Sequence, residues 1–286
     1  MRILITGGAG MLSRALLAEL PTRGHEVVAL DRRGLDITDP AAVGETIAAL
    51  RPDVVIQGAA YTDVDGSEAR EDYARLVNAD ATRTAARACK LVGARLVYPS
   101  TDYVFDGSAR RPYLPGDQAR PINAYGRTKL LGERAALEFD DALVVRVAWL
   151  YGPEKRSFIR TMIEKARAID AGEPGGLRVV SDQTGAPTWT RDAASMIAGL
   201  LERRVPAGIY HATGVGAVRR DDLAREALRL AGLGHVPVES VGFGDFPSPA
   251  TRPAFTVLDM QATQAILGPL PPWNDRLAQA ILEGAF

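Results

Sequence analysis

The sequence contains a single cysteine, Cys89, among 286 residues. One thiol cannot form an internal disulfide, so the fold does not depend on an oxidising compartment. The three histidines, His25, His211 and His235, stand far apart, and their spacing matches no zinc-binding pattern. We therefore expect a protein of a reducing compartment without structural zinc.

Long apolar runs and an excess of one charge are also missing. The apolar N-terminal run ends by Gly7, which is too short for a secretory signal, and no later run is long enough to span a bilayer. The chain has 34 basic and 35 acidic side chains and a formal net charge of -1. This balance gives no electrostatic reason to expect nucleic acid or a membrane as a partner, and arginine pairs such as Arg219-Arg220 are expected on the solvated surface. The pattern favours a cytoplasmic globular protein.

Strand-like and helix-like segments alternate along the first half of the chain. Five apolar runs have the composition of buried strands: 2–6, 25–30, 53–56, 94–99 and 143–147. Such alternation predicts an α/β fold with a doubly wound parallel sheet of the Rossmann type, including one long helix over 68–91. We expect residues 1–150 to form a dinucleotide-binding domain to which 177–214 return. Residues 151–176 and 215–286 are expected to form a smaller substrate-binding lobe.

The first strand-to-helix turn has the composition of a dinucleotide-binding loop. Gly7 and Gly10 match the first two positions of a Gly-x-x-Gly-x-x-Gly pattern, and Ser13 is small enough to hold the third. The backbone amides at the helix start, around Met11 and Leu12, are suited to holding a diphosphate. We expect this loop to bind NADPH or NADH.

The end of the second strand carries two opposing signals for cofactor choice. Asp31 stands where a carboxylate accepts hydrogen bonds from the adenosine ribose. Arg32 follows directly and could instead pair with the 2′-phosphate of NADP. Asp36 and Ile37 are expected beside the adenine. The choice between NAD and NADP therefore stays open.

The third strand ends in small residues, Ala59 and Ala60, followed by Tyr61. Small side chains at the carboxyl end of a parallel strand let a flat ligand approach the backbone, so we expect cofactor contacts here. Asn78, in the predicted long helix, is interpreted as an ordinary polar side chain on a helix face. The alternative is that it holds backbone or water behind the neighbouring strand.

Tyr125 and Lys129 lie four residues apart in a predicted helix, so both point to one side, one turn apart. A nearby ammonium favours the phenolate and would lower the tyrosine pKa from about 10. Thr101, at the end of the fourth strand, can offer a hydroxyl to the carbonyl oxygen that such a phenol would protonate. The three residues form a candidate proton-donor set.

Longer strings of residues carry a resemblance to a known family. They are Ala59–Asp65, Ser100–Gly107, Tyr125–Lys129, Asp182–Thr188 and Arg252-Pro253. With these strings, which are spread over most of its length, the chain resembles the dTDP-4-dehydrorhamnose reductase family of the extended short-chain dehydrogenase/reductase superfamily. The resemblance implies hydride transfer from a nicotinamide to the C4 keto group of a dTDP-sugar, with Thr101, Tyr125 and Lys129 as the catalytic residues.

The resemblance also implies a role for each residue of the site. Tyr125 would give its proton to the carbonyl oxygen, Thr101 would bind that oxygen, and Lys129 would hold the nicotinamide ribose. Arg252 would be the candidate for the diphosphate. The positions implied to meet the substrate are Val64, Asp65, Thr101, Tyr103, Trp149 and Arg252.

The chain departs from the family at Ser157, where asparagine is common, and at Phe255-Thr256, where Asn-Ser is usual. These departures leave nucleotide-sugar recognition open. Ala15 stands where some members carry a glutamate that binds magnesium between subunits, so we expect no metal and either a monomer or a homodimer. A dehydratase would need an acid in place of Tyr103. Another nucleotide-sugar 4-ketoreductase, or a non-catalytic NADP-binding regulatory subunit, remains an alternative.

Overall fold

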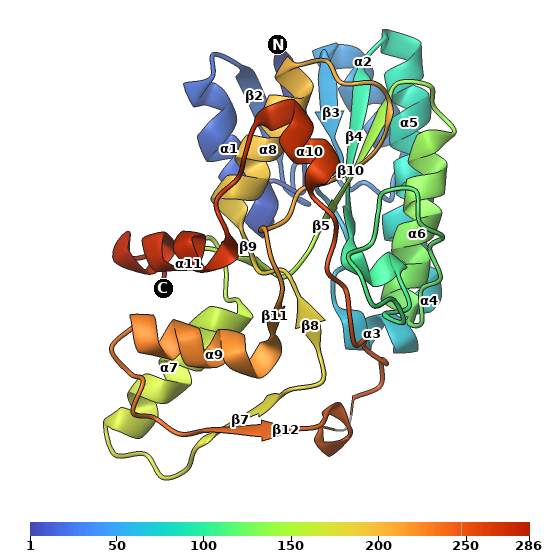
Figure 1. Ribbon diagram of the computed structural model, residues 1–286. Coiled ribbons are helices and arrows are strands. Elements are labelled where there is room, and N and C mark those ends of the chain that lie inside the picture. The colour runs from blue at the N-terminus through green and yellow to red at the C-terminus, as the bar shows by residue number, and fades with distance from the viewer. Residues whose placement is uncertain (247) are drawn as a thin grey trace.

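The computed structural model describes residues 1–246 and 248–286. Its larger part is a six-stranded parallel sheet with helices on both faces (Figure 1). The strands lie in the order β10-β5-β4-β3-β1-β2. Their bounds are β1 Arg2–Thr6, β2 Glu26–Leu30, β3 Val54–Ile56, β4 Arg95–Thr101, β5 Ala142–Val147 and β10 Gly208–His211. The order changes direction between β1 and β3, and ligands of such sheets bind in the crevice at that point. The predicted fold class is confirmed.

Alternate residues of the central strands enter two separate hydrophobic cores. Ile3 and Ile5 of β1 pack on one face, under α1 (Met11–Thr22) and α8 (Thr190–Glu202). Leu4 packs on the other face, which α2 (Pro40–Leu50), α5 (Ala81–Val92) and α6 (Ala124–Leu137) cover. Because side chains alternate along a strand, burial of both faces requires a continuous apolar run. This is why these strands could be predicted.

The helix predicted over 68–91 is wrong as a single element. The structure has α3 (Val64–Ala69), α4 (Glu71–Arg75) and a π-helical segment η1 (Leu76–Asp80) before α5. Asp63 caps α3 by accepting a hydrogen bond from the Gly66 amide, and Arg70 leaves the helical conformation at φ -137° and ψ 47°. By contrast, the predicted start of α2 is confirmed, since Asp39 accepts from two amides and Pro40 occupies the first turn.

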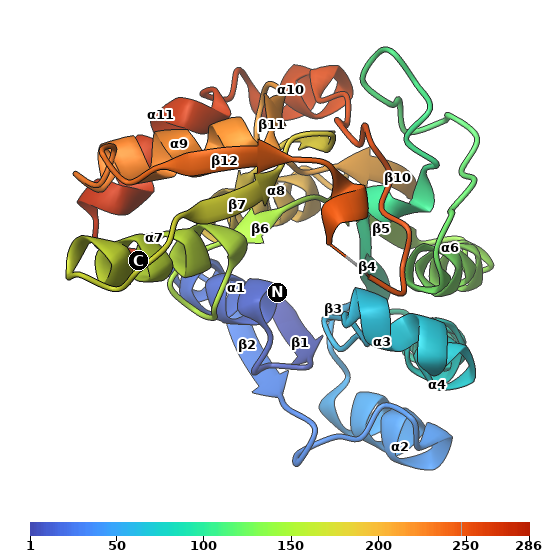
Figure 2. The same ribbon diagram turned by 90° about the horizontal axis from the view of Figure 1, so that it is seen from below.

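A smaller lobe lies beyond the carboxyl ends of the large sheet (Figure 1). It contains three short strand pairs around its own hydrophobic core. The strands are β6 Leu150–Tyr151 with β9 Thr188–Trp189, β7 Leu177–Val180 with β12 Val238–Val241, and β8 Thr184–Gly185 with β11 Val218–Arg219. The helices are α7 Phe158–Asp170, α9 Arg220–Leu230 and α11 Trp273–Leu282. Figure 2 shows β7 and β12 side by side.

The course of the chain differs from the expected division at two places. Residues 177–180 form β7 and pair with β12 in the smaller lobe, whereas α8 and β10 lie with the large sheet. In the opposite sense, α10 (Gln261–Leu267) packs against α8 rather than in the lobe. Two short 3-10 turns, η2 (Asp102–Val104) and η3 (Phe243–Asp245), complete the described elements. Across the described residues, we find no helix with the length and apolar character needed to cross a bilayer.

Candidate active site

A cavity of about 540 Å³ opens at the carboxyl ends of the parallel strands, and residues of the smaller lobe help to line it. A second cavity of about 270 Å³ adjoins it. Gly10, Gly58, Ala60 and Lys155 line both. The two cavities therefore form one elongated cleft that begins at the end of β2 and reaches the lobe.

The glycine loop gives this cleft its floor. Gly7 has a φ of +64°, and a Cβ atom there would lie 2.6 Å from the Cα atom of Ala59. A Cβ on Gly58 would lie 2.7 Å from the carbonyl oxygen of Thr6. Only glycine allows the turns after β1 and β3 to approach so closely. Helix α1 begins at Met11 without a side-chain cap, so its first amides remain available to an anion. This cradle fits the diphosphate of a dinucleotide.

Every residue predicted to bind the cofactor lines one of the two cavities. Seven of these positions line the smaller cavity without reaching the larger one: Gly7, Asp31, Arg32, Asp36, Ile37, Ala59 and Tyr61. Gly10 and Ala60 line both cavities, and Met11, Leu12, Tyr125 and Lys129 line the larger one. The structure thus gathers residues from five separate segments along one cleft.

Two contacts bear on the recognition of the adenosine. One oxygen of Asp31 accepts hydrogen bonds from the amides of Arg33 and Gly34, at 2.9 and 3.1 Å. Arg32 is exposed and lies 3.6 Å from Asp36. The turn thereby holds Asp31 in place. Arg32 could leave the Asp36 carboxylate for a phosphate at a small cost in free energy, because exposed ion pairs are weak. Asp31 and Arg32 both remain able to meet a ribose or its 2′-phosphate.

Thr101, Tyr125 and Lys129 come together in the larger cavity. Thr101 ends β4, and the other two lie one turn apart on α6. Asn123 caps this helix by accepting a hydrogen bond from the Gly126 amide at 2.8 Å, which fixes the turn that carries Tyr125. The structure therefore brings the three predicted residues to one cavity, and their catalytic role stays a prediction.

The electrostatics of Tyr125 differ from the expectation. Burial raises the pKa of the Tyr125 phenol above its usual value, and a hydrogen bond with Thr101 partly opposes this. The Lys129 ammonium donates to the carbonyl of Pro99 at 2.7 Å and lies 3.9 Å from the centre of the Tyr98 ring, and it is not among the groups that shift the Tyr125 pKa. Burial lowers the pKa of Lys129 to about 7. The site therefore keeps the phenol protonated at neutral pH, which is the form that donates a proton.

Asn78 is a structural part of the site, so its interpretation as a helix-face residue is wrong. It is 1% exposed. Its side chain accepts from the Tyr61 amide at 2.9 Å and donates to the Tyr61 carbonyl and to the Thr128 hydroxyl, both at 3.1 Å. The π-helical segment turns Asn78 toward these partners. The alternative, that it holds backbone behind the neighbouring strand, is confirmed.

Sequence reasoning missed a buried ion pair behind the catalytic helix. Arg146 of β5 and Glu133 of α6 are each 2% exposed and make two contacts of 2.8 Å. Ser100 also donates to Glu133, at 2.6 Å. Glu133 follows Lys129 by one turn, so the pair fixes the helix just beyond the ammonium. The available signal was a pair of opposite charges at positions that should be apolar.

Sequence reasoning also missed Asp102, although this residue lies within the segment Ser100–Gly107 that carries the family resemblance. It is 3% exposed and lines the larger cavity. It accepts a hydrogen bond from Thr101 at 3.0 Å, while its other oxygen has no partner among the described residues. Burial raises the pKa of the Asp102 carboxyl to about 6. The carboxyl therefore titrates close to neutral pH.

The predicted substrate residues divide into two groups. Val64, Thr101, Tyr103 and Trp149 line the larger cavity. Asp65 and Arg252 do not line it and are instead paired with each other, with the closest N–O contact at 2.8 Å. The cavity has three further cationic residues, none of which the sequence analysis expected at the site: Lys155, Arg156 and Arg220. Arg220 is therefore not simply the solvated surface residue that the arginine doublet suggested.

The chain has a doubly wound parallel sheet, and a threonine, a tyrosine and a lysine line the cavity at the carboxyl ends of its strands. This combination defines the class of short-chain dehydrogenase/reductase enzymes. Residues 1–285 match the model of a family described as the RmlD substrate binding domain, and the chain belongs to this family.

Named relatives are similar over nearly their whole length. The chain is 44% identical to a dTDP-4-dehydrorhamnose reductase of Streptomyces griseus, over 98% of this chain and 92% of the relative. It is 42% identical to a dTDP-4-keto-6-deoxy-D-glucose reductase of Streptomyces niveus, over 98% and 96%. A crystal structure of dTDP-4-dehydrorhamnose reductase from Bacillus anthracis, in complex with NADP, has a TM-score of 0.92 and 34% identity, covering 99% of both chains.

Proposed function

We propose that this protein reduces the 4-keto group of a dTDP-linked deoxysugar with NADPH or NADH. The observation that carries the proposal is that Thr101, Tyr125 and Lys129 line one cavity, continuous with the cleft of the glycine loop. We favour dTDP-4-dehydro-L-rhamnose as the substrate and dTDP-L-rhamnose as the product. The names of two relatives with high coverage support this choice.

Each residue of the site has a task in this reaction. When bound, the nicotinamide cofactor supplies a hydride to the keto carbon. Tyr125, held in its protonated form, donates its proton to the carbonyl oxygen as negative charge develops there. Thr101 binds the same oxygen by redirecting the hydroxyl that now donates to Asp102. Lys129 in its ammonium form binds ribose hydroxyls by exchanging its hydrogen bond to Pro99.

A second 4-keto sugar remains a candidate because the relative from Streptomyces niveus carries a different substrate in its name at nearly the same identity. The departures noted in the sequence bear on this choice. Ser157 caps α7 by accepting from the Arg160 amide at 3.3 Å, whereas Thr256 is buried close to Asp102 and acts to lower the pKa of that carboxyl. Thr256 thus affects the site itself, whereas Ser157 serves the lobe.

The proposal is tested by following cofactor oxidation with two substrates, dTDP-4-dehydro-L-rhamnose and dTDP-4-keto-6-deoxy-D-glucose, each with NADPH and with NADH. We expect turnover with the first sugar, and the better cofactor will resolve the opposing signals of Asp31 and Arg32. Preference for the second sugar would replace the substrate but keep the reaction. Cofactor binding without turnover of either sugar would favour a regulatory subunit.

We further propose that the protein is cytoplasmic, acts without nucleic acid or membrane partners, and is a monomer or a homodimer without a bridging metal. Light scattering coupled to gel filtration, with and without a chelator, measures the oligomeric state. A dimer that dissociates when the chelator is added would contradict the proposal of a metal-free assembly.

A further inference from the structure

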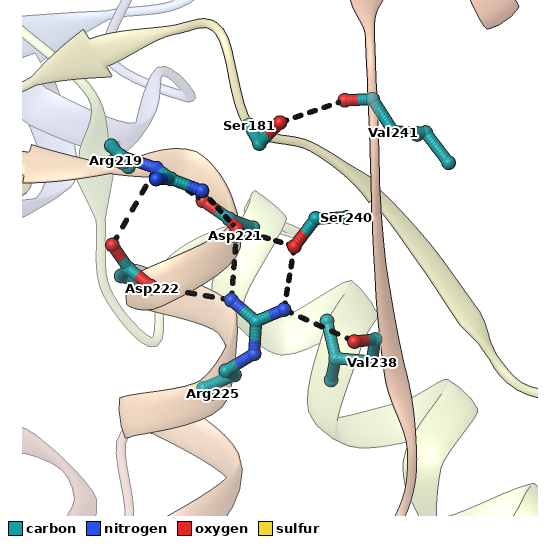
Figure 3. A network of polar contacts seen from close by, with 8 residues as sticks. All are labelled: Ser181, Arg219, Asp221, Asp222, Arg225, Val238, Ser240 and Val241. Carbon is teal, nitrogen blue, oxygen red and sulfur yellow. Dashed lines mark hydrogen bonds and ion pairs between the residues drawn. The ribbon is translucent and has the colours of Figure 1, made fainter.

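One buried carboxylate in the first turn of α9, Asp221, neutralises two arginines, Arg219 and Arg225 (Figure 3). The Asp221 side chain is 0% exposed. It accepts hydrogen bonds from Arg219 and Arg225, with closest contacts of 2.7 and 2.8 Å, and from Ser240 at 2.6 Å. Since Ser240 belongs to β12, the cluster ties the first turn of α9 to that strand. It therefore fixes the direction in which the neighbouring residue, Arg220, points.

Arg220 has a different environment from the other two arginines. Its guanidinium lies 3.6 Å from the centre of the Trp149 ring and 4.7 Å from that of Phe158. It lines the larger cavity, and no carboxylate of the described residues forms an ion pair with it. The amide of Arg220 donates to the Gln183 carbonyl at 3.0 Å, which fixes its backbone. A cation on an aromatic platform is thus presented to the cavity with no carboxylate in ion-pair contact, although the Asp102 carboxyl in the same cavity attracts it from farther away.

The rest of the cavity adds positive charge around this position. Lys155 and Arg156 are exposed and line the same cavity, whereas Asp102 is the one acidic residue that lines it within the described chain. Arg252 differs, because both of its terminal nitrogens contact the Asp65 carboxylate. Binding an anion through Arg252 would first require breaking that pair. Arg220 needs no such exchange.

We propose that Arg220 binds the diphosphate of the nucleotide-sugar substrate, an inference that rests on the proposed function. The planar guanidinium matches two phosphate oxygens with two parallel hydrogen bonds, and the aromatic rings of Trp149 and Phe158 hold its plane. The cofactor diphosphate has its own cradle at Gly7 and Gly58, in another part of the cleft. Arg220 therefore determines affinity for the sugar nucleotide and leaves affinity for the dinucleotide unchanged.

Calorimetric titration of the whole protein with dTDP, thymidine and NADPH tests this assignment. For Arg220→Gln we expect about 10- to 100-fold weaker binding of dTDP, because charge-assisted hydrogen bonds are lost, with thymidine and NADPH unaffected. Arg220→Lys keeps the charge and loses the paired geometry, so its loss should be smaller. Arg229→Gln is the matched control, since this exposed arginine of the same helix pairs with Glu226 outside the Asp221 cluster, and it should bind dTDP like the parent protein.

NADPH binding by each variant reports whether the fold is intact. Equal dTDP affinity in the parent and in Arg220→Gln would overturn the inference and leave the proposed function standing. A loss of NADPH affinity alone would also overturn it, because Arg220 would then serve the cofactor. A parent protein that does not bind dTDP at all would overturn both this inference and the proposed function.

Discussion

The carboxylate of Asp65 and the guanidinium of Arg252 form a two-pronged ion pair with N–O distances of 2.9 and 2.8 Å. Asp65 lies in the first turn of α3, and Arg252 lies in the segment that returns from the smaller lobe after β12. The amide of Ala250 also donates to Asp65, at 3.2 Å. These contacts connect the two parts of the molecule beside the cleft, and the hydrogen bond from Arg252 holds the pKa of Asp65 well below its usual range.

This pair should make a small, pH-dependent contribution to stability. We expect Asp65→Asn to lower the free energy of unfolding by about 1 kcal/mol at pH 7, since the carboxylate is 41% exposed. A lowered pKa contributes stability above the unfolded-state value of about 4, and the contribution is lost as the pH falls below it. Urea unfolding from pH 7 to pH 3 should therefore show the difference between the two proteins shrinking. A difference that stays constant over this range would assign the effect to another cause.

Replacing the proton donor should remove turnover without removing the cofactor. We expect Tyr125→Phe to reduce kcat by about 100- to 10,000-fold, as is typical when a general acid is lost, while NADPH affinity stays the same. Tyr210→Phe is the matched control, because its hydroxyl contacts Pro206 away from the cavity, at 2.9 Å. Steady-state kinetics and fluorescence titration of NADPH measure the two properties. Near-normal turnover by Tyr125→Phe would show that the proton comes from elsewhere.

The reduction rate should fall as the pH rises through about 7. Burial lowers the pKa of Lys129 to about this value, so the ammonium is present below it and lost above it. The pH profile of kcat/KM for the sugar should therefore fall through about pH 7, above the titration of the Asp102 carboxyl, whose pKa is about 6. Arginine stays protonated throughout, so Lys129→Arg should move this limb to higher pH, at some cost in rate. A flat profile from pH 6 to pH 9 in the parent protein would mean that the bound lysine does not titrate there.

The buried pair of Glu133 and Arg146 should be essential for stability. We expect Glu133→Gln to lower the free energy of unfolding by about 3–5 kcal/mol, because it leaves a buried guanidinium without its counter-charge. Glu138 caps the end of the same helix, α6, and forms an exposed ion pair with Arg83. Glu138→Gln removes this pair and should cost less than about 1 kcal/mol. Urea denaturation compares them directly. Similar costs for the two variants would refute a special role for the buried pair.

The central sheet could be predicted because its strands are buried on both faces and so read as apolar runs. The two-residue strands β6, β8, β9 and β11 have no such periodicity and exist because their partners lie beside them. The helix predicted over 68–91 breaks at Arg70, and its π-helical segment carries Asn78, whose partners Tyr61 and Thr128 are 17 and 50 positions away. Local helix propensity cannot register such contacts.

The relative position of the candidate residues Tyr125 and Lys129 could also be predicted. Tyr125 and Lys129 are placed by the helical repeat alone, so their spacing was sufficient. Arg219 and Arg220 are adjacent in sequence, yet Asp221 binds one and the cavity receives the other. Their difference depends on the orientation of α9 against β12, which the sequence pattern does not encode. The same holds for the pKa of Tyr125, which is raised by burial that only the folded structure creates.

The path of the chain between the core under α1 and α8 and the core of the smaller lobe has a practical consequence. The chain leaves the large sheet after β5 and returns to it as α8 and β10. It then enters the smaller lobe from β11 to β12 and returns to the large sheet as α10. Finally, α11 packs against α9 in the lobe. Neither core is therefore encoded by one uninterrupted stretch of sequence. A gene fragment ending at any of these junctions would lack part of both cores, and a protease cut in the exposed turn at 172–176 would leave two fragments that remain associated.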